Sequence, residues 1–297
     1  MHSRRIAALV LAVTATLRGA EVGYPAAVAL AKAGRYPEAR DALQAIVDRE
    51  PANAEAWHEL GVVWKARRDN AAYEEAVRCF RKAVEREPKN AAFLADFGGT
   101  SLELAGRTNS LSAAREGKAA LEKAVGMDPS NLDAREGLFQ FYLRAPFFVG
   151  GSTAKADAEL AQIRARDPER ATALAVLARA SMKDYAGAFR LCDEALARNP
   201  NDYTALYQYG RTASVSGTNL QRGVECLRKA LTLEPPHPAS PTHSNLWYRL
   251  GDIEEKLGNP AEARAAYENA VELDPANRQA QSGLGHLPTT PQDARQP

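Results

Sequence analysis

Apolar residues recur along this chain at spacings of three and four positions, with polar residues between them. One such series precedes Pro51 and consists of Tyr36, Ala39, Leu43 and Ile46. This spacing places the apolar side chains on one face of an α-helix. Proline cannot continue a helix because it has no amide hydrogen to donate. The pattern therefore predicts amphipathic helices that end near prolines.

The pattern returns along most of the chain. It precedes a series of prolines that each follow an acidic residue or asparagine and lie 32 to 41 residues apart: Pro51, Pro88, Pro129, Pro168, Pro200, Pro235 and Pro275. Asn53, Asn90 and Asn131 follow three of these prolines and are predicted to cap the next helix through their side-chain oxygens. A period of this length indicates a repeated unit, here a pair of helices.

Several units also carry an earlier helix marked by a large apolar residue and a glycine. Its motifs are Trp57-x-x-Leu60-Gly61-x-x-Trp64, Trp247-x-x-Leu250-Gly251, and the shorter Tyr209-Gly210 and Phe97-Gly98. Small residues let two helices approach closely, and large residues fill the spaces between them. These motifs resemble the tetratricopeptide-repeat family. The resemblance implies an all-α fold, an α-solenoid of antiparallel helix pairs wound into a right-handed superhelix.

The periodicity predicts seven units followed by a short tail helix at 278–286. The units are expected at 20–53, 54–90, 91–131, 132–168, 169–202, 203–235 and 244–277. Units two, three and four are longer than the others, and we expect their extra residues in the turn between the two helices. In units three and four these are Arg107–Gly117 and Ala145–Thr153. The polar residues 287–297 are predicted to form a disordered tail.

The first residues have the pattern of a secretory signal peptide, which we place at 1–19. Arg4 and Arg5 precede the twelve uncharged residues Ile6–Leu17. This apolar run is shorter than the roughly 20 residues that span a bilayer, so no stable membrane span is expected after processing. In a bacterium the pattern predicts a periplasmic or secreted protein. The alternative is an ordinary N-terminal helix, which would leave the protein in the cytoplasm.

Composition and charge narrow the range of partners. Hydrophobic residues make up 45% of the chain and aromatic residues only 7%, which suits packed helices. The formal net charge of +1 argues against binding to nucleic acid. Cys79, Cys192 and Cys226 are widely separated, so we interpret them as buried small residues and not as a disulfide framework or a zinc site.

Sequence patterns typical of catalysis are absent. The pair His58-Glu59 lacks the second histidine of a zinc-protease motif, and no nucleophile elbow or dinucleotide-binding glycine motif is present. We therefore expect no catalytic residues, no cofactor and no metal site, and predict that the protein is not an enzyme.

The resemblance implies that the first helix of each pair lines a concave groove. The groove positions of the family select eight candidate binding residues in this sequence: His58, Lys65, Gln140, Arg144, Tyr207, Arg211, Tyr248 and Asp252. The same positions include Glu136, Ser214 and Lys256. Tyrosine rings with polar tips, placed beside Arg, Gln and Asp, are suited to contacts with a peptide.

One subtype of the family holds the C-terminal carboxylate of a peptide with a clamp of Lys and Asn on adjacent repeats. Units two to four of this chain have Glu59, Asp96 and Gly137 where the Asn or Arg residues of the clamp would lie. The sequence therefore predicts no binding of chaperone tails of that type.

Three functions are compatible with these observations. The leading hypothesis is a non-catalytic scaffold that binds a protein or peptide in its groove, within a bacterial cell envelope. The second is a periplasmic accessory protein of a transporter that binds a small ligand in a pocket shaped by the long loops of units three and four. The third is a cytoplasmic adaptor. The sequence leaves the partner, the pathway and the oligomeric state open.

Overall fold

The computed structural model describes residues 22–237 and 240–287. Within these ranges the chain forms fifteen α-helices and one 3₁₀ turn, without any β-strand, so the predicted all-α class is confirmed. The chain divides into two compact units, an N-terminal unit of Met1–Glu159 and a C-terminal unit of Leu160–Pro297. The expected signal peptide at 1–19 and residues 288–297 of the expected tail lie outside the described residues.

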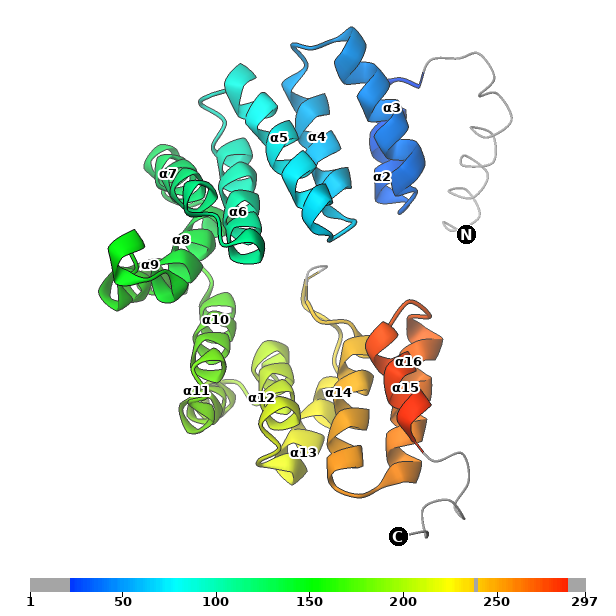
Figure 1. Cartoon of the computed structure of the whole chain (residues 1–297). Helices are drawn as coiled ribbons and strands as arrows, with labels where there is room; N and C mark the ends of the chain where they lie inside the picture. Colours follow the sequence, from blue (N-terminus) through cyan, green and yellow to red (C-terminus); the bar gives the residue numbers. More distant parts are fainter. Residues whose placement is uncertain (1–21, 238–239, 288–297) are drawn as a thin grey trace. The chain divides into compact units, whose positions relative to one another are not determined.

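The N-terminal unit consists of successive helix pairs (Figure 1). Its helices are α2 (Tyr24–Lys32), α3 (Tyr36–Arg49), α4 (Ala54–Lys65), α5 (Asn70–Arg86), α6 (Ala91–Thr108), α7 (Leu111–Met127) and α8 (Leu132–Arg144), followed by the 3₁₀ turn η1 (Phe147–Val149) and by α9 (Thr153–Arg164), which continues past Glu159.

The C-terminal unit repeats the same arrangement. Its helices are α10 (Pro168–Ser181), α11 (Tyr185–Arg198), α12 (Tyr203–Ser216), α13 (Leu220–Ala230), α14 (His243–Lys256), α15 (Pro260–Leu273) and α16 (Arg278–His286).

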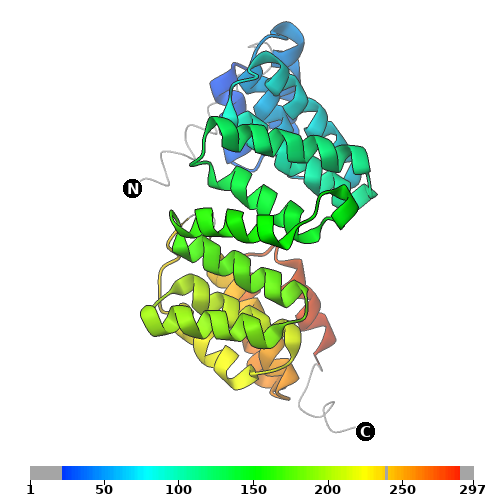
Figure 2. The same ribbon diagram turned by 90° about the vertical axis from the view of Figure 1, so that its left-hand side faces the viewer.

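Within each unit, first helices pack against their own partners and against one or both helices of the preceding pair. In the N-terminal unit α6 packs on α5 and α7, and α8 packs on α6 and α7 (Figures 1 and 2). In the C-terminal unit α12 packs on α10, α11 and α13, and α14 packs on α12, α13 and α15. The first helices of neighbouring repeats therefore form a continuous layer within each unit.

Polar side chains cap the helices as the sequence predicted. The side chains of Asn53, Asn90 and Asn131 accept hydrogen bonds from backbone amides in the first turns of α4, α6 and α8. Such caps satisfy amides that have no partner within the helix, and each stabilises the helix by about 1 kcal/mol. The three predicted caps are confirmed, and they set where the first helix of each repeat begins.

Two glycines show why the first helices need a small residue. A Cβ atom on Gly61 would lie 2.8 Å from the ring of Phe80 in α5, and one on Gly251 would lie 2.6 Å from the ring of Tyr267 in α15. Both distances are too short for a side chain to fit. The glycine and the aromatic residue together set the spacing of the helix pair, which explains their recurrence in the sequence.

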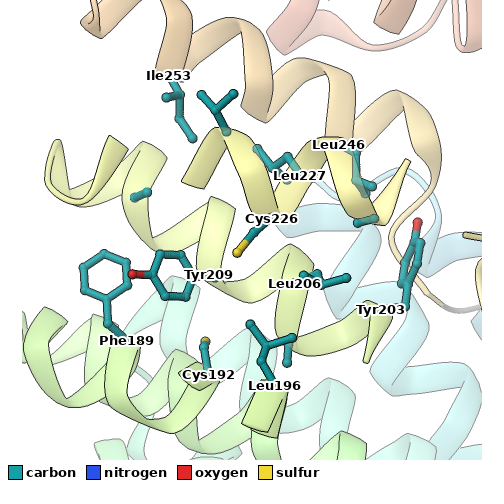
Figure 3. Packing of buried hydrophobic residues seen from close by; sticks show 14 of the residues in the cluster. Phe189, Cys192, Leu196, Tyr203, Leu206, Tyr209, Cys226, Leu227, Leu246 and Ile253 are labelled. Carbon is teal, nitrogen blue, oxygen red and sulfur yellow. The ribbon is translucent and has the colours of Figure 1, made fainter. Parts of the chain in front are cut away.

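The core of the C-terminal unit lies between successive pairs. Figure 3 shows side chains from α11, α12, α13 and α14 meeting there, among them Leu196, Leu206 and Leu227. Cys192 and Cys226 lie in the same cluster and are buried, as is Cys79 in the N-terminal unit. The interpretation of the cysteines as buried small residues is therefore confirmed.

The expected position of the extra residues of unit three is wrong. Arg107–Gly117 does not form a long turn, because α6 continues to Thr108 and α7 begins at Leu111. The helices are joined by Asn109, which adopts a left-handed conformation that asparagine tolerates better than most residues, and by Ser110, which caps α7. The additional residues therefore lengthen the two helices.

The extra residues of unit four do form a loop, at 145–152. Gly150 has a φ of 109°, and Ser152 accepts a hydrogen bond from the amide of Lys155, so it caps α9. The side chains of Phe147 and Phe148 are 92% and 79% exposed, so this apolar turn is not folded back onto the described helices.

The chain end differs from the prediction at one residue. Leu287 was expected to begin the disordered tail, but it is buried beside Tyr267 and the tail helix α16.

The segment before α14 is held by Tyr203, whose hydroxyl donates to the carbonyl of Pro241, and by His243, whose Nε2 lies 2.9 Å from the carbonyl oxygen of Leu233.

Candidate functional site

The candidate residues of unit two lie on α4 and face α6, the first helix of the next repeat. His58 packs its ring against Phe93, at 4.6 Å between ring centres, and its Nε2 atom lies 2.7 Å from Oδ2 of Asp96. Lys65 forms an ion pair with Glu103 at 2.7 Å. We call the four polar residues His58, Lys65, Asp96 and Glu103 the α4–α6 surface. Each predicted binding residue here is already paired with a carboxylate.

The candidates of unit four lie on α8, one repeat further along. The side-chain nitrogen of Gln140 donates to Glu136 at 3.0 Å within the helix. Arg144 is exposed at the last turn of α8, just before the loop that carries Phe147 and Phe148. Because α8 follows α6, these two residues lie two repeats away from His58 and Lys65 and do not belong to the same cluster.

The candidates of units six and seven lie together on α12 and α14. Tyr207 and Arg211 are one helical turn apart on α12, and Tyr248 lies on the adjacent α14. The side chain of Arg249 extends over the ring of Tyr248, at 4.9 Å from its centre, and its Nη1 atom donates to the hydroxyl of Ser214 at 3.2 Å. Tyr248 is further held by stacking on Tyr267.

Asp252 completes this cluster through a network with its neighbours. Its Oδ2 atom accepts from the hydroxyl of Ser214 at 2.6 Å and from Nζ of Lys256 at 2.5 Å, and Lys256 also donates to the carbonyl of Ser214 at 2.6 Å. We call these residues the α12–α14 surface: Tyr207, Arg211, Ser214, Tyr248, Arg249, Asp252 and Lys256.

The two arginines of the α12–α14 surface have no carboxylate partner among the described residues. Burial lowers the pKa of the Arg211 guanidinium, the nearby Tyr207 phenol opposes this, and the positive charge of Arg249 lowers the pKa further. Burial also raises the pKa of the Tyr248 phenol. The surface therefore presents two positive charges without a carboxylate partner, beside the phenols of Tyr207 and Tyr248.

Clefts elsewhere in the C-terminal unit are open. One of them, of about 440 Å³, is lined by Arg164, Pro168, Glu194 and Arg198, which are exposed, and by Thr172, Ala175 and Leu191. Within the described ranges, no three His, Cys, Asp or Glu side chains are placed to hold a metal ion. None of the described helices is both long enough and apolar enough to cross a membrane.

Family comparison identifies the repeated unit. Models of the tetratricopeptide repeat match residues 21–63, 54–90 and 244–277, and the last two ranges coincide with units two and seven of the sequence analysis. The matches fall on helix pairs that pack as described above. The chain is a tetratricopeptide-repeat protein.

Solved structures are similar to this tetratricopeptide-repeat protein in fold. A tetratricopeptide repeat protein from Parabacteroides merdae ATCC 43184 aligns with a TM-score of 0.57 at 16% identity, over 87% of this chain and 94% of that chain. At this identity the similarity shows the fold alone. Among curated proteins, none matches the sequence.

Two other solved structures align with lower scores. PilW, a type IV pilus biogenesis factor, has a TM-score of 0.44 at 18% identity, over 87% of this chain and 94% of its own. YrrB, a tetratricopeptide-repeat protein with an unusual peptide-binding site, has a TM-score of 0.37 at 19% identity, over 68% and 96%. Neither similarity is close enough to carry an argument about this chain.

Sequence reasoning missed the pairing of Asp96 with His58, and it did not name Glu103 or Arg249. Asp96 and Glu103 contact two predicted binding residues, His58 and Lys65, and Arg249 adds a second guanidinium beside Arg211. Asp96 and Arg249 each lie two residues before the glycine of their first helix, a position outside the family's groove positions used for the prediction. Comparing this position between repeats would have revealed that it is acidic in Asp96 and basic in Arg249.

Proposed function

We propose that this protein is a non-catalytic scaffold that binds a protein or peptide on the surface of its first helices. Tetratricopeptide repeats are characteristic of protein-interaction scaffolds. The observation that carries the proposal is the α12–α14 surface, where aromatic and guanidinium groups lie together and both arginines lack a carboxylate partner. Tyr and Arg are the residues that most often dominate binding energy at protein interfaces.

Two further observations favour a scaffold over a small-ligand site and over an enzyme with a cysteine nucleophile. The 440 Å³ cleft is lined largely by exposed residues, whereas a site for a small ligand usually encloses most of the ligand. The cysteine thiols are buried, and burial raises the pKa of Cys79 to about 12 and that of Cys226 to about 11. Thiols that stay protonated at neutral pH are poor nucleophiles.

We further propose that the protein is exported and acts in a bacterial cell envelope. The support for this location is the sequence of residues 1–19, with two arginines followed by an uncharged run. Intact-mass measurement on the native protein tests it. Loss of about the first twenty residues, with recovery in the periplasmic fraction, is the expected result. A protein that retains residues 1–19 in the cytosol would contradict export and favour a cytoplasmic adaptor.

The experiment that tests the scaffold function is affinity capture from native extract with the tagged full-length chain. It is run beside the double variant Arg211→Glu/Tyr248→Ala, which reverses one charge and removes one ring from the α12–α14 surface. We expect one specific partner that the wild-type chain captures and the variant loses. A partner captured equally by both would move the interface elsewhere, for example to Phe147 and Phe148. No specific partner at all would contradict the scaffold.

A further inference from the structure

Arg211 is a partly buried guanidinium for which the described residues provide no hydrogen-bond or ion-pair partner. Most arginines that are withdrawn from water in a folded protein are paired with an acid, because an unpaired buried charge is costly. The N-terminal unit follows this rule, since the buried Arg135 pairs with Glu159 at 2.7 Å. Arg211 departs from it, because none of the described residues pairs with its guanidinium.

The side chain of Arg249 converges on the same place. Its Nη1 atom donates to Ser214, which lies three residues after Arg211 on the same face of α12. Three residues along a helix correspond to a rise of about 4.5 Å. The two guanidinium groups are therefore close neighbours, although they come from consecutive repeats.

The matching contact in the N-terminal unit supports this placement. His58 and Tyr207 both lie three residues before the glycine of their helix, and Asp96 and Arg249 both lie two residues before the glycine of the next first helix. His58 and Asp96 are in direct contact at 2.7 Å. The equivalent positions on α12 and α14 hold Tyr207 and Arg249, so we infer that this phenol and this guanidinium face each other across the two helices.

The charges around the two arginines leave them uncompensated. Asp252 is the acidic residue within the cluster, and it is engaged by Lys256 and by the hydroxyl of Ser214. Lys256 is thereby neutralised, whereas Arg211 and Arg249 are not. The Tyr207 and Tyr248 phenols are available as hydrogen-bond donors beside them, because the described residues provide no acceptor for either hydroxyl.

We propose that Arg211 and Arg249, flanked by Tyr207 and Tyr248, bind the carboxylate side chains of an acidic segment in the partner protein. This inference rests on the proposed scaffold function and adds the chemistry of the partner. A guanidinium fork matches a carboxylate with two parallel hydrogen bonds, and each phenol adds one donor. The two arginines come from adjacent repeats, so they suit two acidic side chains along an extended peptide better than one compact anion. The site differs from the Lys and Asn clamp in its residues, two arginines and two phenols, although Arg249 lies at the position where the clamp has Asn or Arg.

The test measures binding of labelled ten-residue peptides to the full-length chain by fluorescence anisotropy. The probe peptide alternates Glu and Ala, and the matched neutral peptide alternates Gln and Ala. We expect the Glu peptide to bind at least about tenfold more tightly than the Gln peptide at 50 mM salt, and to weaken as salt rises. Equal binding of the two peptides would overturn the proposal.

Variants locate the site. Arg211→Gln/Arg249→Gln is expected to weaken the Glu peptide about tenfold or more. Tyr207→Phe/Tyr248→Phe, which keeps the rings and removes the hydroxyls, is expected to weaken it a few-fold. The control Arg190→Gln/Arg222→Gln removes the same charge from the exposed second helices α11 and α13 and is expected to bind like wild type. Loss of binding in the control to the same extent would overturn the proposal, because it would indicate general charge attraction. Circular dichroism melts establish that each variant is folded.

Two more ligands separate the carboxylate peptide from related anions. If free succinate competes as well as the peptide does, the occupant is a small carboxylate and the proposed peptide is wrong. If a Gln-Ala peptide carrying one phosphoserine binds and the Glu peptide does not, the site takes a phosphate and the proposed carboxylate is wrong.

The same arginine variant distinguishes this inference from the scaffold function. If affinity capture yields a specific partner with wild type and equally with Arg211→Gln/Arg249→Gln, the scaffold stands and the carboxylate site fails. If the Glu peptide binds through the arginines but capture yields no protein, the site stands as an anion site and the scaffold fails. Capture lost in the variant, and restored in part by Arg211→Lys/Arg249→Lys, is the result we expect.

Discussion

The α4–α6 surface of the N-terminal unit and the α12–α14 surface of the C-terminal unit carry opposite charges at equivalent places. Asp96 and Arg249 each lie two residues before the glycine of their first helix, and Glu103 and Lys256 each lie five residues after it. In the N-terminal unit the acidic residues pair with His58 and Lys65 of the preceding repeat. In the C-terminal unit both equivalent positions are basic, and Arg249 is left without an acid.

This difference separates the residues that stack the repeats from those that we propose bind a partner. Both units share the glycines and buried aromatic residues, which set the spacing of the helices and therefore the positions of the surface side chains. The charges at those places are free to vary. Where they are complementary, as on the α4–α6 surface, neighbouring repeats satisfy each other. Where the charges are alike, as for Arg211 and Arg249 on the α12–α14 surface, neighbouring repeats do not neutralise each other. An acidic partner could then supply the missing negative charge.

The largest expected effect tests whether the two surfaces share one geometry. Gly98→Ala and Gly210→Ala should each destabilise the protein by about 1–3 kcal/mol, because the new Cβ would lie 2.7 Å from Leu121 and 2.3 Å from Leu227. Gly126→Ala is the control: no atom lies within 4 Å of its Cβ position, so a gain of about 0.5–1 kcal/mol is expected. Urea unfolding measures all three. A large loss at only one of Gly98 and Gly210 would break the equivalence of the two surfaces.

The next largest effect is expected when the charges at Arg249 and Asp96 are exchanged. Arg249→Asp places a carboxylate beside Arg211 and should stabilise the C-terminal unit by up to about 1 kcal/mol. Asp96→Arg removes the acid from His58 and should destabilise the N-terminal unit by a similar amount. Hydrogen exchange of amides in α12 and α4 measures the two changes separately. Destabilisation by Arg249→Asp would show that Arg211 and Arg249 are not in electrostatic conflict.

A smaller effect comes from removing single charges. Lys65→Gln should cost only a few tenths of a kcal/mol, because the side chains of Lys65 and Glu103 are 35% and 44% exposed and surface ion pairs contribute little. Arg211→Gln should be neutral or slightly stabilising, since it removes an unpaired, partly buried charge. Urea unfolding at 50 mM salt measures both. A clear loss of stability in Arg211→Gln would reveal a structural partner for this side chain.

The smallest effect concerns the buried cysteines in the hydrophobic cores of the two units. Burial raises the pKa of Cys79 in the N-terminal unit to about 12 and that of Cys226 in the C-terminal unit to about 11. The folded thiols thus hold their protons above the pH at which unfolded thiols ionise, and stability should fall as pH rises past about 9. A thiol reagent at pH 8 should modify both more than about tenfold more slowly than in urea. Rapid modification of one of them would show that its unit is loosely packed.

Most of the fold could be predicted from the sequence because its determinants are local. Proline, asparagine and glycine act within a few residues of their own position, as Asn53 does in capping α4. The misplaced turn at Arg107–Gly117 shows the limit. A helix end and a helix start there are separated only by Asn109 and Ser110, and the surrounding residues suit a helix and a turn almost equally well.

The candidate binding surfaces were harder to predict because their properties depend on contacts between repeats. The groove positions named Arg211 and Tyr248, and the structure brings them together with Tyr207. They did not reveal that His58 and Lys65 are occupied by Asp96 and Glu103, some 38 residues further along the chain. Whether a charged side chain is paired depends on the register between helices, which no single repeat contains.

Tyr267 links the last three helices in a way that matters for protein engineering. Its ring fills the space left by Gly251 on α14 and by Gly283 on α16, and its hydroxyl donates to Glu255. The groove of α15 that an added repeat would have to enter is therefore already filled by α16. New repeats should therefore be inserted before α14, keeping α14, α15 and α16 together as one unit. The array can then be lengthened without exposing the apolar residues that these three helices bury.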